Sequence, residues 1–547
     1  MEHIVNGDEL AEQSELQSLI DVFHYSFARF PEKKAFTNLG FSLTYQALDE
    51  ASAAFGAYLQ QHTSLEPGDR IAIQLPNLLQ YPIACIGALR AGFVVVNTNP
   101  LYTEREMEHQ FNDSEAKAIV IFAHMADKLE KILPNTQIQD VIVTHIADVL
   151  PAPKRWLVNT VVKHVKKMVP DFSLPQAVSF NDALNKGKKL TLKEAKPQAE
   201  DIAVLQYTGG TTGVAKGAML THNNLVSNML QCKASMGDLI KEGQETVIAP
   251  LPVYHIYTFT VNGLFFMLTG NETVFITNPR DLPSFVKTLK ETKFTGLVGL
   301  NTLFAALCNS EDFQNEVDFS GLKMTLSGGM ALSQGVAHRW EAVTGCQIVE
   351  GYGMTETSPV ISFNPPDDVR LGTVGRPVPG TQVCLMSEEG EMVTPSEVGE
   401  LCCRGPQVMR GYWKRDDATA KTITAEGWIK TGDIATIDAD GYISIVDRKK
   451  DMIIVSGFNV YPNEIEDEIS LHEGILEAAA IGVEDEKTGE AVKLFVVKKD
   501  PAITENDVIE FARKNLTAYK VPKQVEFIDE LPKTAVGKVL RRALRGS

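Results

Sequence analysis

Short runs of β-branched residues alternate with longer amphipathic stretches along most of this chain, which limits what it can fold into. The apolar runs include RIAIQL at 70–75, FVVVN at 93–97, AIVIF at 118–122 and DVIVTH at 140–145. Runs that are apolar on both faces suit parallel strands covered by helices. The pattern resumes after residue 200. We therefore expect an α/β body over residues 1–446, with two sheets flanked by helices.

Two later stretches depart from this rhythm. Between Gly375 and Arg404, short strands with Gly and Pro turns predict a smaller β-rich subdomain inside the body. The charged string DRKKD at 447–451 is interpreted as a hinge. Residues 452–547 have a mixed α and β pattern that is long enough for a small α+β domain of their own.

Composition excludes several classes of protein. The 52 Lys and Arg against 70 Asp and Glu give a net charge of −18, so we expect no whole-surface affinity for nucleic acid. The seven cysteines are scattered without C-x-x-C spacing, which favours reduced thiols over a zinc site. The polar, acidic N-terminus does not resemble a signal peptide, and no apolar run approaches ~20 residues, so we expect a cytoplasmic protein.

A loop rich in Gly and Thr is the first candidate site. It comprises Tyr207, Thr208, Gly209, Gly210, Thr211, Thr212, Gly213, Val214, Ala215 and Lys216, followed by Gly217. Glycines allow backbone N–H groups to approach an anion, and the hydroxyls add donors. The loop is not a Walker A motif, because its lysine precedes a glycine and an apparent strand. Taken alone, it is explained equally well by a plain hairpin turn.

Four further clusters follow in the chain. They are Glu350-Gly351-Tyr352-Gly353-Met354-Thr355-Glu356, Thr431-Gly432-Asp433, Asp447-Arg448-Lys449-Lys450-Asp451, and Pro532-Lys533-Thr534-Ala535-Val536-Gly537-Lys538. Singly, each has an ordinary explanation as a turn, a solvated charge run or a basic tail. In this order and spacing, the five clusters together resemble the adenylate-forming superfamily of acyl-CoA synthetases, luciferases and adenylation domains. The subgroup that the chain resembles most is the bacterial long-chain fatty acyl-CoA synthetases, through EGWIKTGDIATIDADGYISIVDRKKDMI at 426–453.

The resemblance implies a two-step reaction. A fatty acid carboxylate attacks the α-phosphorus of Mg-ATP to give acyl-AMP and pyrophosphate, and the CoA thiol then displaces AMP. Both steps build negative charge, which positioned cations and N–H donors stabilise. ATP, CoA and Mg²⁺ are therefore the expected co-substrates and ion.

The resemblance also implies roles for individual residues. The loop from Tyr207 to Lys216 would hold the β- and γ-phosphates, Thr355 would contact the α-phosphate, and Glu356 would help hold Mg²⁺. Tyr352 would stack on adenine beside Gly328 and Gly329. Asp433 would accept both ribose hydroxyls, with Arg448 adding a contact.

Three positions belong to the C-terminal part of this scheme. By resemblance, Lys538 would reach the reacting oxygens during acyl-AMP formation, as a flexible ammonium can. Lys450 would be the hinge about which a mobile C-terminal domain swings between the two steps. That motion would bring Gly457 and Phe458 to the CoA side.

The apolar segment 251–270 would form the acyl pocket wall. Within it, His255 of the motif Pro252-Val253-Tyr254-His255 would be a gate near the CoA tunnel, with a core histidine as the alternative. Phe259 falls where some long-chain members carry a gating Trp, which leaves the gate's identity open. Ordinary buried core would look the same, so the sequence does not determine the acyl chain length.

The segment 152–170 carries Lys154, Arg155, Lys163, Lys166 and Lys167 without an acidic residue. On a helix, Leu157, Val161, Val165 and Met168 share one face. This pattern predicts peripheral contact with an anionic membrane, on the inner face of the cytoplasmic membrane. A helix that packs on its own domain explains the pattern equally well.

Other readings remain open. A medium-chain acyl-CoA synthetase or an acyl-AMP ligase of the same superfamily would share the nucleotide motifs. A fatty-acid binding protein without catalysis would not need Glu356, Asp433, Arg448 and Lys538 together. A homodimer is a further partner that the sequence leaves undecided.

Overall fold

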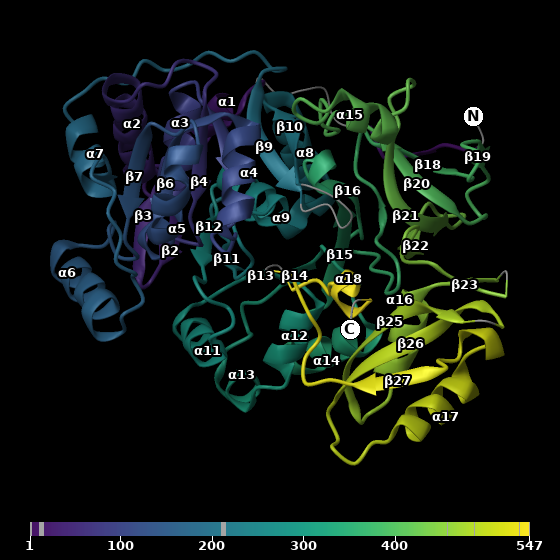
Figure 1. Ribbon diagram of the computed structural model, residues 1–547. Coiled ribbons are helices and arrows are strands. Elements are labelled where there is room, and N and C mark those ends of the chain that lie inside the picture. The colour runs from purple at the N-terminus through teal and green to yellow at the C-terminus, as the bar shows by residue number, and fades with distance from the viewer. Residues whose placement is uncertain are drawn as a thin grey trace.

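The computed structural model describes residues 3–9, 16–208, 215–456, 458–485, 487–534 and 537–545. In these ranges the strands form four sheets, of which two are flanked α/β sheets, one is a β-rich sheet and one belongs to the C-terminal part. This arrangement confirms the predicted fold class. Figure 1 shows the C-terminal part (yellow-green to yellow) below the β-rich sheet, with the α/β sheets beside both.

The first α/β sheet has the strand order β10-β9-β5-β4-β6-β7-β8. Its strands are β4 (Arg70–Gln74), β5 (Val94–Asn97), β6 (Ala116–Phe122), β7 (Asp140–Thr144), β8 (Val178–Ser179), β9 (Ile202–Thr208) and β10 (Lys216–Thr221). From β9 to β8 neighbouring strands are parallel, and only β10 is antiparallel to its neighbour β9. The apolar runs of the sequence are thus buried parallel strands, as predicted.

The second α/β sheet has the order β17-β16-β15-β14-β13-β11-β12-β2-β3. Its strands are β2 (Lys34–Asn38), β3 (Phe41–Thr44), β11 (Thr246–Ala249), β12 (Glu272–Phe275), β13 (Gly296–Gly299), β14 (Met324–Ser327), β15 (Ile348–Gly353), β16 (Val360–Phe363) and β17 (Arg376–Pro377). The strands from β15 to β2 are parallel, and antiparallel strands close both edges.

Helices surround both sheets, some against a sheet face and one at the edge of the molecule (Figure 1). They are α1 (Leu19–Arg29), α2 (Tyr45–His62), α3 (Gln80–Arg90), α4 (Glu104–Ser114), α5 (Ala126–Ile132), α6 (Ala152–Thr160), α7 (Phe180–Gly187), α8 (His222–Met236), α9 (Ile256–Thr258), α10 (Phe266–Leu268), α11 (Leu282–Glu291), α12 (Asn301–Cys308), α13 (Glu311–Glu316), α14 (Gln334–Thr344) and α15 (Asp416–Thr422). Helix α8 begins with a capping box, in which Thr221 and Asn224 each accept the other's backbone N–H. No helix in the described ranges is long and apolar enough to cross a membrane.

The β-rich sheet is larger than the sequence predicts. Its order is β1-β18-β20-β21-β22, with β19 paired to β18. The strands are β1 (Val5–Asn6), β18 (Gln382–Met386), β19 (Met392–Val393), β20 (Gly399–Arg404), β21 (Ile429–Ile437) and β22 (Ile443–Arg448). Val5 and Asn6 thus complete a sheet whose other strands all lie after residue 381 in the sequence. A strand of two residues is too short to leave a periodic signal in the sequence.

The C-terminal part has its own sheet, β24-β23-β26-β25 with β27 beside β26, and its own apolar core. Its elements are β23 (Ile453–Val455), β24 (Phe458–Val460), α16 (Pro462–Ser470), β25 (Ile475–Asp485), β26 (Gly489–Lys498), α17 (Glu505–Asn515), β27 (Gln524–Phe527) and α18 (Arg541–Leu544). Strand β22 ends at Arg448 and β23 begins at Ile453, so the link between the two sheets coincides with the charged string.

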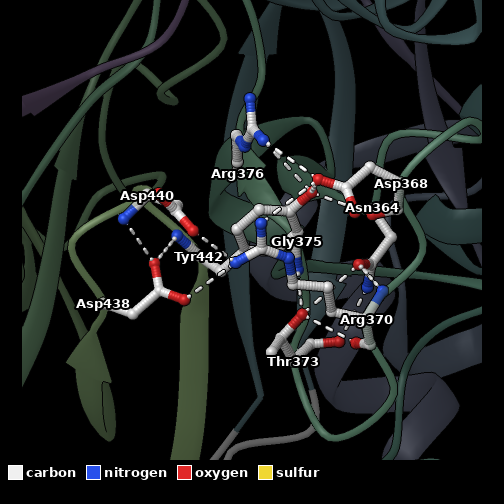
Figure 2. A network of polar contacts seen from close by, with 9 residues as sticks. All are labelled: Asn364, Asp368, Arg370, Thr373, Gly375, Arg376, Asp438, Asp440 and Tyr442. Atoms are coloured by element: carbon white, nitrogen blue, oxygen red, sulfur yellow. Dashed lines mark hydrogen bonds and ion pairs between the residues drawn. The ribbon is translucent and has the colours of Figure 1, made fainter.

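A polar network joins the loop after β16 to the turn between β21 and β22 (Figure 2). The guanidinium of Arg370 lies over the ring of Tyr442 and donates to Asp440 at 2.8 Å (Nη1 to Oδ2). The Tyr442 hydroxyl donates to Asp368 Oδ2 at 2.7 Å. Thr373 in this loop lines a large cavity of the protein. The network therefore holds one wall of that cavity against the β-rich sheet.

Candidate active site

A cavity of about 1740 Å³ lies between the body and the C-terminal domain. The sequence-predicted residues that line it are Tyr207, Thr208, Lys216, His255, Gly328, Gly329, Gly351, Tyr352, Gly353, Thr355, Glu356, Asp433, Arg448, Lys450 and Lys538. Side chains from the first α/β sheet, the second α/β sheet, the β-rich sheet and the C-terminal domain therefore meet around one space.

Several predicted residues do not line this cavity. Phe259 is buried, at 1 % exposed, and lies outside the cavity lining. Phe458 is 55 % exposed and stacks on Tyr519, with ring centroids 4.8 Å apart. Gly209, Gly210, Thr211, Thr212, Gly213 and Gly457 lie outside the described residues.

Tyr352, Asp433 and Arg448 form a chain of contacts at the cavity wall. The Tyr352 hydroxyl, from the end of β15, donates to Asp433 Oδ2 at 2.5 Å. Arg448 Nε lies 3.4 Å from Asp433 Oδ1. Asp433 and Arg448 are direct partners across the β21–β22 ladder, so the backbone register holds the ion pair in place.

Glu356 is held by Tyr412, a residue that the sequence did not indicate. The carboxylate is 7 % exposed, and its Oε1 accepts the Tyr412 hydroxyl at 2.6 Å. The ammonium of Lys216 lies 4.1 Å from the centre of the same tyrosine ring. Burial raises the pKa of Glu356, while the Tyr412 hydrogen bond and the charges of Lys216 and Arg448 act in the opposite direction.

The hydroxyl of Tyr207 is engaged by a partner away from the Gly/Thr loop. It donates to Asp113 Oδ2 at 2.6 Å, and Asp113 lies at the end of helix α4. Gly217 permits this position, since a Cβ there would lie 3.0 Å from the tyrosine ring. In this structure the Tyr207 hydroxyl thus donates to the body, and its role toward phosphate stays a prediction.

The turn after β15 requires glycine. A Cβ on Gly353 would lie 1.9 Å from the carbonyl oxygen of Pro359 in the returning chain. This close approach directs Thr355 and Glu356 of the short 3₁₀ helix η6 (Thr355–Thr357) to the cavity. Gly329, after β14, has φ +82°, a conformation that L side chains rarely adopt.

Lys538 reaches the cavity from the C-terminal domain. The preceding Gly537 has φ +83°, and a Cβ there would lie 3.2 Å from Thr302 Oγ1 of the body. Burial of the ammonium, with repulsion from Arg448 and Lys450, lowers the pKa of Lys538 to about 7. Burial and Arg448 also lower the pKa of Lys450. Arg448, Lys450 and Lys538 thus form a local group of cations in the cavity wall, where an anion can bind.

A second set of charges, also not indicated by the sequence, holds the Lys538 loop in place. Arg541 Nη2 donates to both oxygens of Glu466, at 2.8 and 2.7 Å, and to Asn463 Oδ1 at 2.8 Å. Both partners belong to helix α16. A partly buried, bidentate pair of this kind fixes the orientation of α18 and of the loop before it.

Two titratable groups in the cavity lining, His255 and Glu350, are mostly uncharged at pH 7. Burial and the nearby charge of Lys538 lower the pKa of His255 to about 4, so its ring is uncharged. Burial raises the pKa of Glu350 to about 8, although its Oε1 accepts the backbone N–H of Leu332. Neither group adds a full charge to the site at neutral pH.

Apolar side chains also line the cavity. They include Cys232 and Met236 of α8, Val261 of the π-helical turn η5 (Phe259–Phe265), and Val360 and Phe363 of β16. The segment 251–270 contributes to this lining, as predicted. The contribution of α8 follows from the spacing of Cys232, Ser235 and Met236, which places them on one helix face.

In chemical terms, the cavity combines a cationic region with an apolar lining. Among the sequence-predicted residues of the lining, Lys216, Arg448, Lys450 and Lys538 are the cations, and Asp433 and Glu356 are the carboxylates. Among the described residues, no three His, Cys, Asp or Glu side chains are grouped to hold a metal ion by themselves. A divalent ion would therefore need ligands from a phosphate-bearing substrate as well as Glu356.

Known proteins match nearly the whole chain. The family model for AMP-binding enzymes matches residues 23–413, and the model for the AMP-binding enzyme C-terminal domain matches 464–538. A curated long-chain-fatty-acid–CoA ligase of Salmonella typhimurium is 53 % identical over 530 residues, which are 97 % of this chain and 94 % of that protein. The protein of that name from Bacillus subtilis is 40 % identical over 534 residues, 96 % of this chain and 94 % of that one.

Solved structures agree in fold. ATP-bound MatB from Rhodopseudomonas palustris has a TM-score of 0.83 at 29 % identity, covering 96 % of this chain and 98 % of that one. The anthranilate CoA ligase AuaEII in complex with anthranoyl-AMP has a TM-score of 0.86 at 24 % identity, covering 98 % of each chain, which supports the fold alone. With family models over both parts of the chain and relatives of this identity, the chain belongs to the AMP-binding enzyme family.

Proposed function

We propose that this protein activates long-chain fatty acids with ATP to acyl-AMP and then transfers the acyl group to CoA, releasing AMP. The observation that carries this proposal is that the cation group of Lys216, Arg448, Lys450 and Lys538 and a set of apolar side chains line the same cavity. Its volume of about 1740 Å³ exceeds the roughly 300–1,000 Å³ of a site for one small ligand, so a nucleotide and an acyl chain can share it. The curated relatives are named for the same activity.

In the first half-reaction, a carboxylate oxygen attacks the α-phosphorus and pyrophosphate leaves. Thr355 would contact the α-phosphate, and Lys216 and the rest of the Gly/Thr loop would bind the β- and γ-phosphates. Lys538 would neutralise charge that develops on the phosphoryl and carboxylate oxygens. Preorganised cations in a site shielded from water are the main source of rate enhancement in such reactions.

Nucleoside recognition would use the contacts that the site already contains. Asp433 accepts the hydroxyl of Tyr352 in this structure, and a ribose hydroxyl would take over that acceptor position. Tyr352 would then be free to stack on adenine beside Gly328 and Gly329. Mg²⁺ would enter with ATP, with phosphate oxygens and Glu356 as ligands.

In the second half-reaction, the CoA sulfur attacks the acyl carbon, the bond to AMP breaks, and the thiol proton is released. The link at 447–451 would allow the C-terminal domain, residues 452–547, to rotate about Lys450. That rotation would remove Lys538 and bring Gly457 and the exposed Phe458 to the CoA side. His255 would act as a gate at the cavity, since its neutral ring is not charged for acid catalysis at pH 7.

The test is CoA-dependent release of AMP from ATP over a panel of medium to very long fatty acids, with pyrophosphate measured in parallel. Long-chain acids should give the highest kcat/KM. Pyrophosphate release without CoA-dependent AMP release would indicate an acyl-AMP ligase instead. Fatty-acid binding without pyrophosphate release would contradict the proposed activity altogether.

A further inference from the structure

The segment 152–168, which is helical over 152–165, is largely exposed and has unusual surface chemistry. Helix α6 continues directly into the π-helical turn η3 (Val161–Val165), and neither contains a buried residue. Four large apolar side chains are exposed on it: Trp156 at 71 %, Leu157 at 57 %, Val165 at 73 % and Met168 at 54 %. They are four of the twelve exposed large apolar side chains in the described parts of the chain. Figure 1 shows α6 at the lower left edge of the molecule.

The opposite side of this segment anchors it to the body. Asn159 accepts the backbone N–H of Ala147 at 3.1 Å and donates to Asp148 Oδ1 at 2.9 Å. Val169 is buried and Val162 packs against the core. The segment is therefore held with its apolar face turned outward, which contradicts the alternative that this face packs on its own domain.

A second element extends the exposed apolar surface. The ammonium of Lys154 donates to the carbonyl oxygen of Leu39 at 2.5 Å, in the turn between β2 and β3. Leu39 is itself 40 % exposed. The surface formed by Leu39 and residues 152–168 is called the α6 face below.

The charge of the α6 face opposes that of the protein. Lys154, Arg155, Lys163, Lys166 and Lys167 lie in it, and residues 151–170 contain no acidic side chain, in a protein of net charge −18. A partner must therefore accept large apolar side chains and also be anionic. A second copy docked face to face would place ten such cations, five from each chain, against one another without counter-charges.

We propose that the α6 face is a docking surface for an anionic lipid bilayer. Lysine and arginine heads would lie at the lipid phosphates, and their stems would cover apolar surface. Leu157, Val165 and Met168 would enter the boundary of the acyl chains, and Trp156 would sit at the headgroup level. Docking itself does not depend on the proposed reaction. If the protein has the proposed function, docking would place the enzyme at the bilayer, in which long-chain acids dissolve.

The first test is co-sedimentation of the full chain with phosphatidylcholine vesicles, with and without phosphatidylglycerol. Binding should require the anionic lipid and weaken with salt. The triple change Lys163→Glu, Lys166→Glu and Lys167→Glu should reduce binding by about tenfold or more. The matched control is Lys186→Glu, Lys188→Glu and Lys189→Glu, which alters net charge equally at exposed positions in and after α7 and should leave binding largely unchanged.

The second test uses the exposure of Trp156. Trp340 and Trp428 are buried and Trp413 is half-buried, so a blue shift of tryptophan emission on anionic vesicles should come from Trp156. Trp156→Phe should abolish the shift and retain most of the binding. Leu157→Ser with Met168→Ser should weaken binding while the charges remain.

Three results would overturn the proposal. They are no binding of the wild type to anionic vesicles, equal binding by the triple variant, or bound protein without a shift from Trp156. A wild-type dimer that the triple variant dissociates, with vesicle binding unaffected, would instead identify the face as a protein interface. Acyl-CoA formation from octanoate in solution should be equal in all these variants, which separates lost docking from lost folding or from failure of the proposed reaction.

Discussion

Lys538 enters the cavity from the C-terminal domain, whereas Lys216, Glu356 and Asp433 come from the body. Its charge is therefore available to a bound substrate only while the two parts are docked as they are here. Under the proposed rotation of the C-terminal domain, Lys216 and Arg448 would stay with the body. A substitution of Lys538 should therefore affect the two half-reactions differently, unlike a substitution of a cation in the body.

Lys538→Ala should reduce acyl-AMP formation by about 100-fold or more, because it removes a positioned cation from the developing charge. Thioester formation from supplied acyl-AMP and CoA should change little, since the proposed rotation would withdraw the lysine in that step. The two half-reactions can be measured separately by pyrophosphate release and by thioester yield. Lys533→Ala, which removes a lysine paired with Glu477, is the control, and an equal loss of both half-reactions in Lys538→Ala would contradict the assigned role.

Tyr412→Phe tests whether Glu356 depends on its hydrogen-bond donor. The change removes the 2.6 Å bond to Glu356 but keeps the ring beneath Lys216. Loss of a bond to a buried charge costs about 1–3 kcal/mol, so we expect the KM for Mg-ATP to rise about tenfold. In a double-mutant cycle with Glu356→Gln, the two effects should be strongly non-additive. Simple additivity would show that Tyr412 acts elsewhere.

Strands β21 and β22 connect Asp433 and Arg448, the proposed nucleotide contacts, to the link between the domains. Asp433 and Arg448 face each other across this ladder, and Lys450 follows two residues after its end. Asp447, in the same strand, accepts the backbone N–H of Asn463 at the start of α16 at 2.8 Å. A rotation of the C-terminal domain about Lys450 must therefore break a contact to α16 while the ladder itself persists.

Lys450→Pro should slow thioester formation more than adenylation. Proline fixes φ near −65° and restricts the preceding residue, so it limits rotation about this link. Pre-steady-state measurement of each half-reaction distinguishes the two rates, with Lys450→Ala as the control for loss of the ammonium. A uniform drop in both rates for the proline variant would count against a hinge at this position.

Docking of the C-terminal domain onto the body also sets the ionisation of the site. Lys538 is buried against Arg448 of the β-rich sheet, and this environment lowers its pKa to about 7. The free enzyme therefore loses the Lys538 charge as the pH rises through about 7. A bound nucleotide adds negative charge nearby and favours the protonated form.

The kcat/KM for adenylation should therefore fall as the pH rises above about 7, and the corresponding fall in kcat should occur at higher pH. The first profile reports the free enzyme and the second the bound complex. The raised pKa values of Glu466 and Glu350, about 7 and about 8, lie in the same range. The variant Lys538→Arg therefore tests whether Lys538 causes the decline in kcat/KM. Arginine stays protonated, so its profile should lack this decline, and a persistent decline would assign the effect to another group.

The agreement between sequence and structure differs among the residues of the site. The apolar runs predicted the flanked sheets, and the five motifs, with the family resemblance that they carry, indicated fifteen described residues that line the cavity. Tyr412, Glu466 and Arg541 carry no comparable signal, because each acts through a partner that is distant in the chain. The pairing of β1 with β18 was missed for the same reason.

Local patterns were thus sufficient where a residue's role follows from its neighbours in the chain. Hydrophobic period identifies a strand or helix, and glycine spacing identifies a tight loop, since both depend on short-range sterics. Only the tertiary structure decided three other features. These are the direction of the Tyr207 hydroxyl, the lowered pKa of Lys538 and the outward orientation of the 152–168 segment. Each depends on burial or on a charge brought close by folding, and no local pattern records those distances.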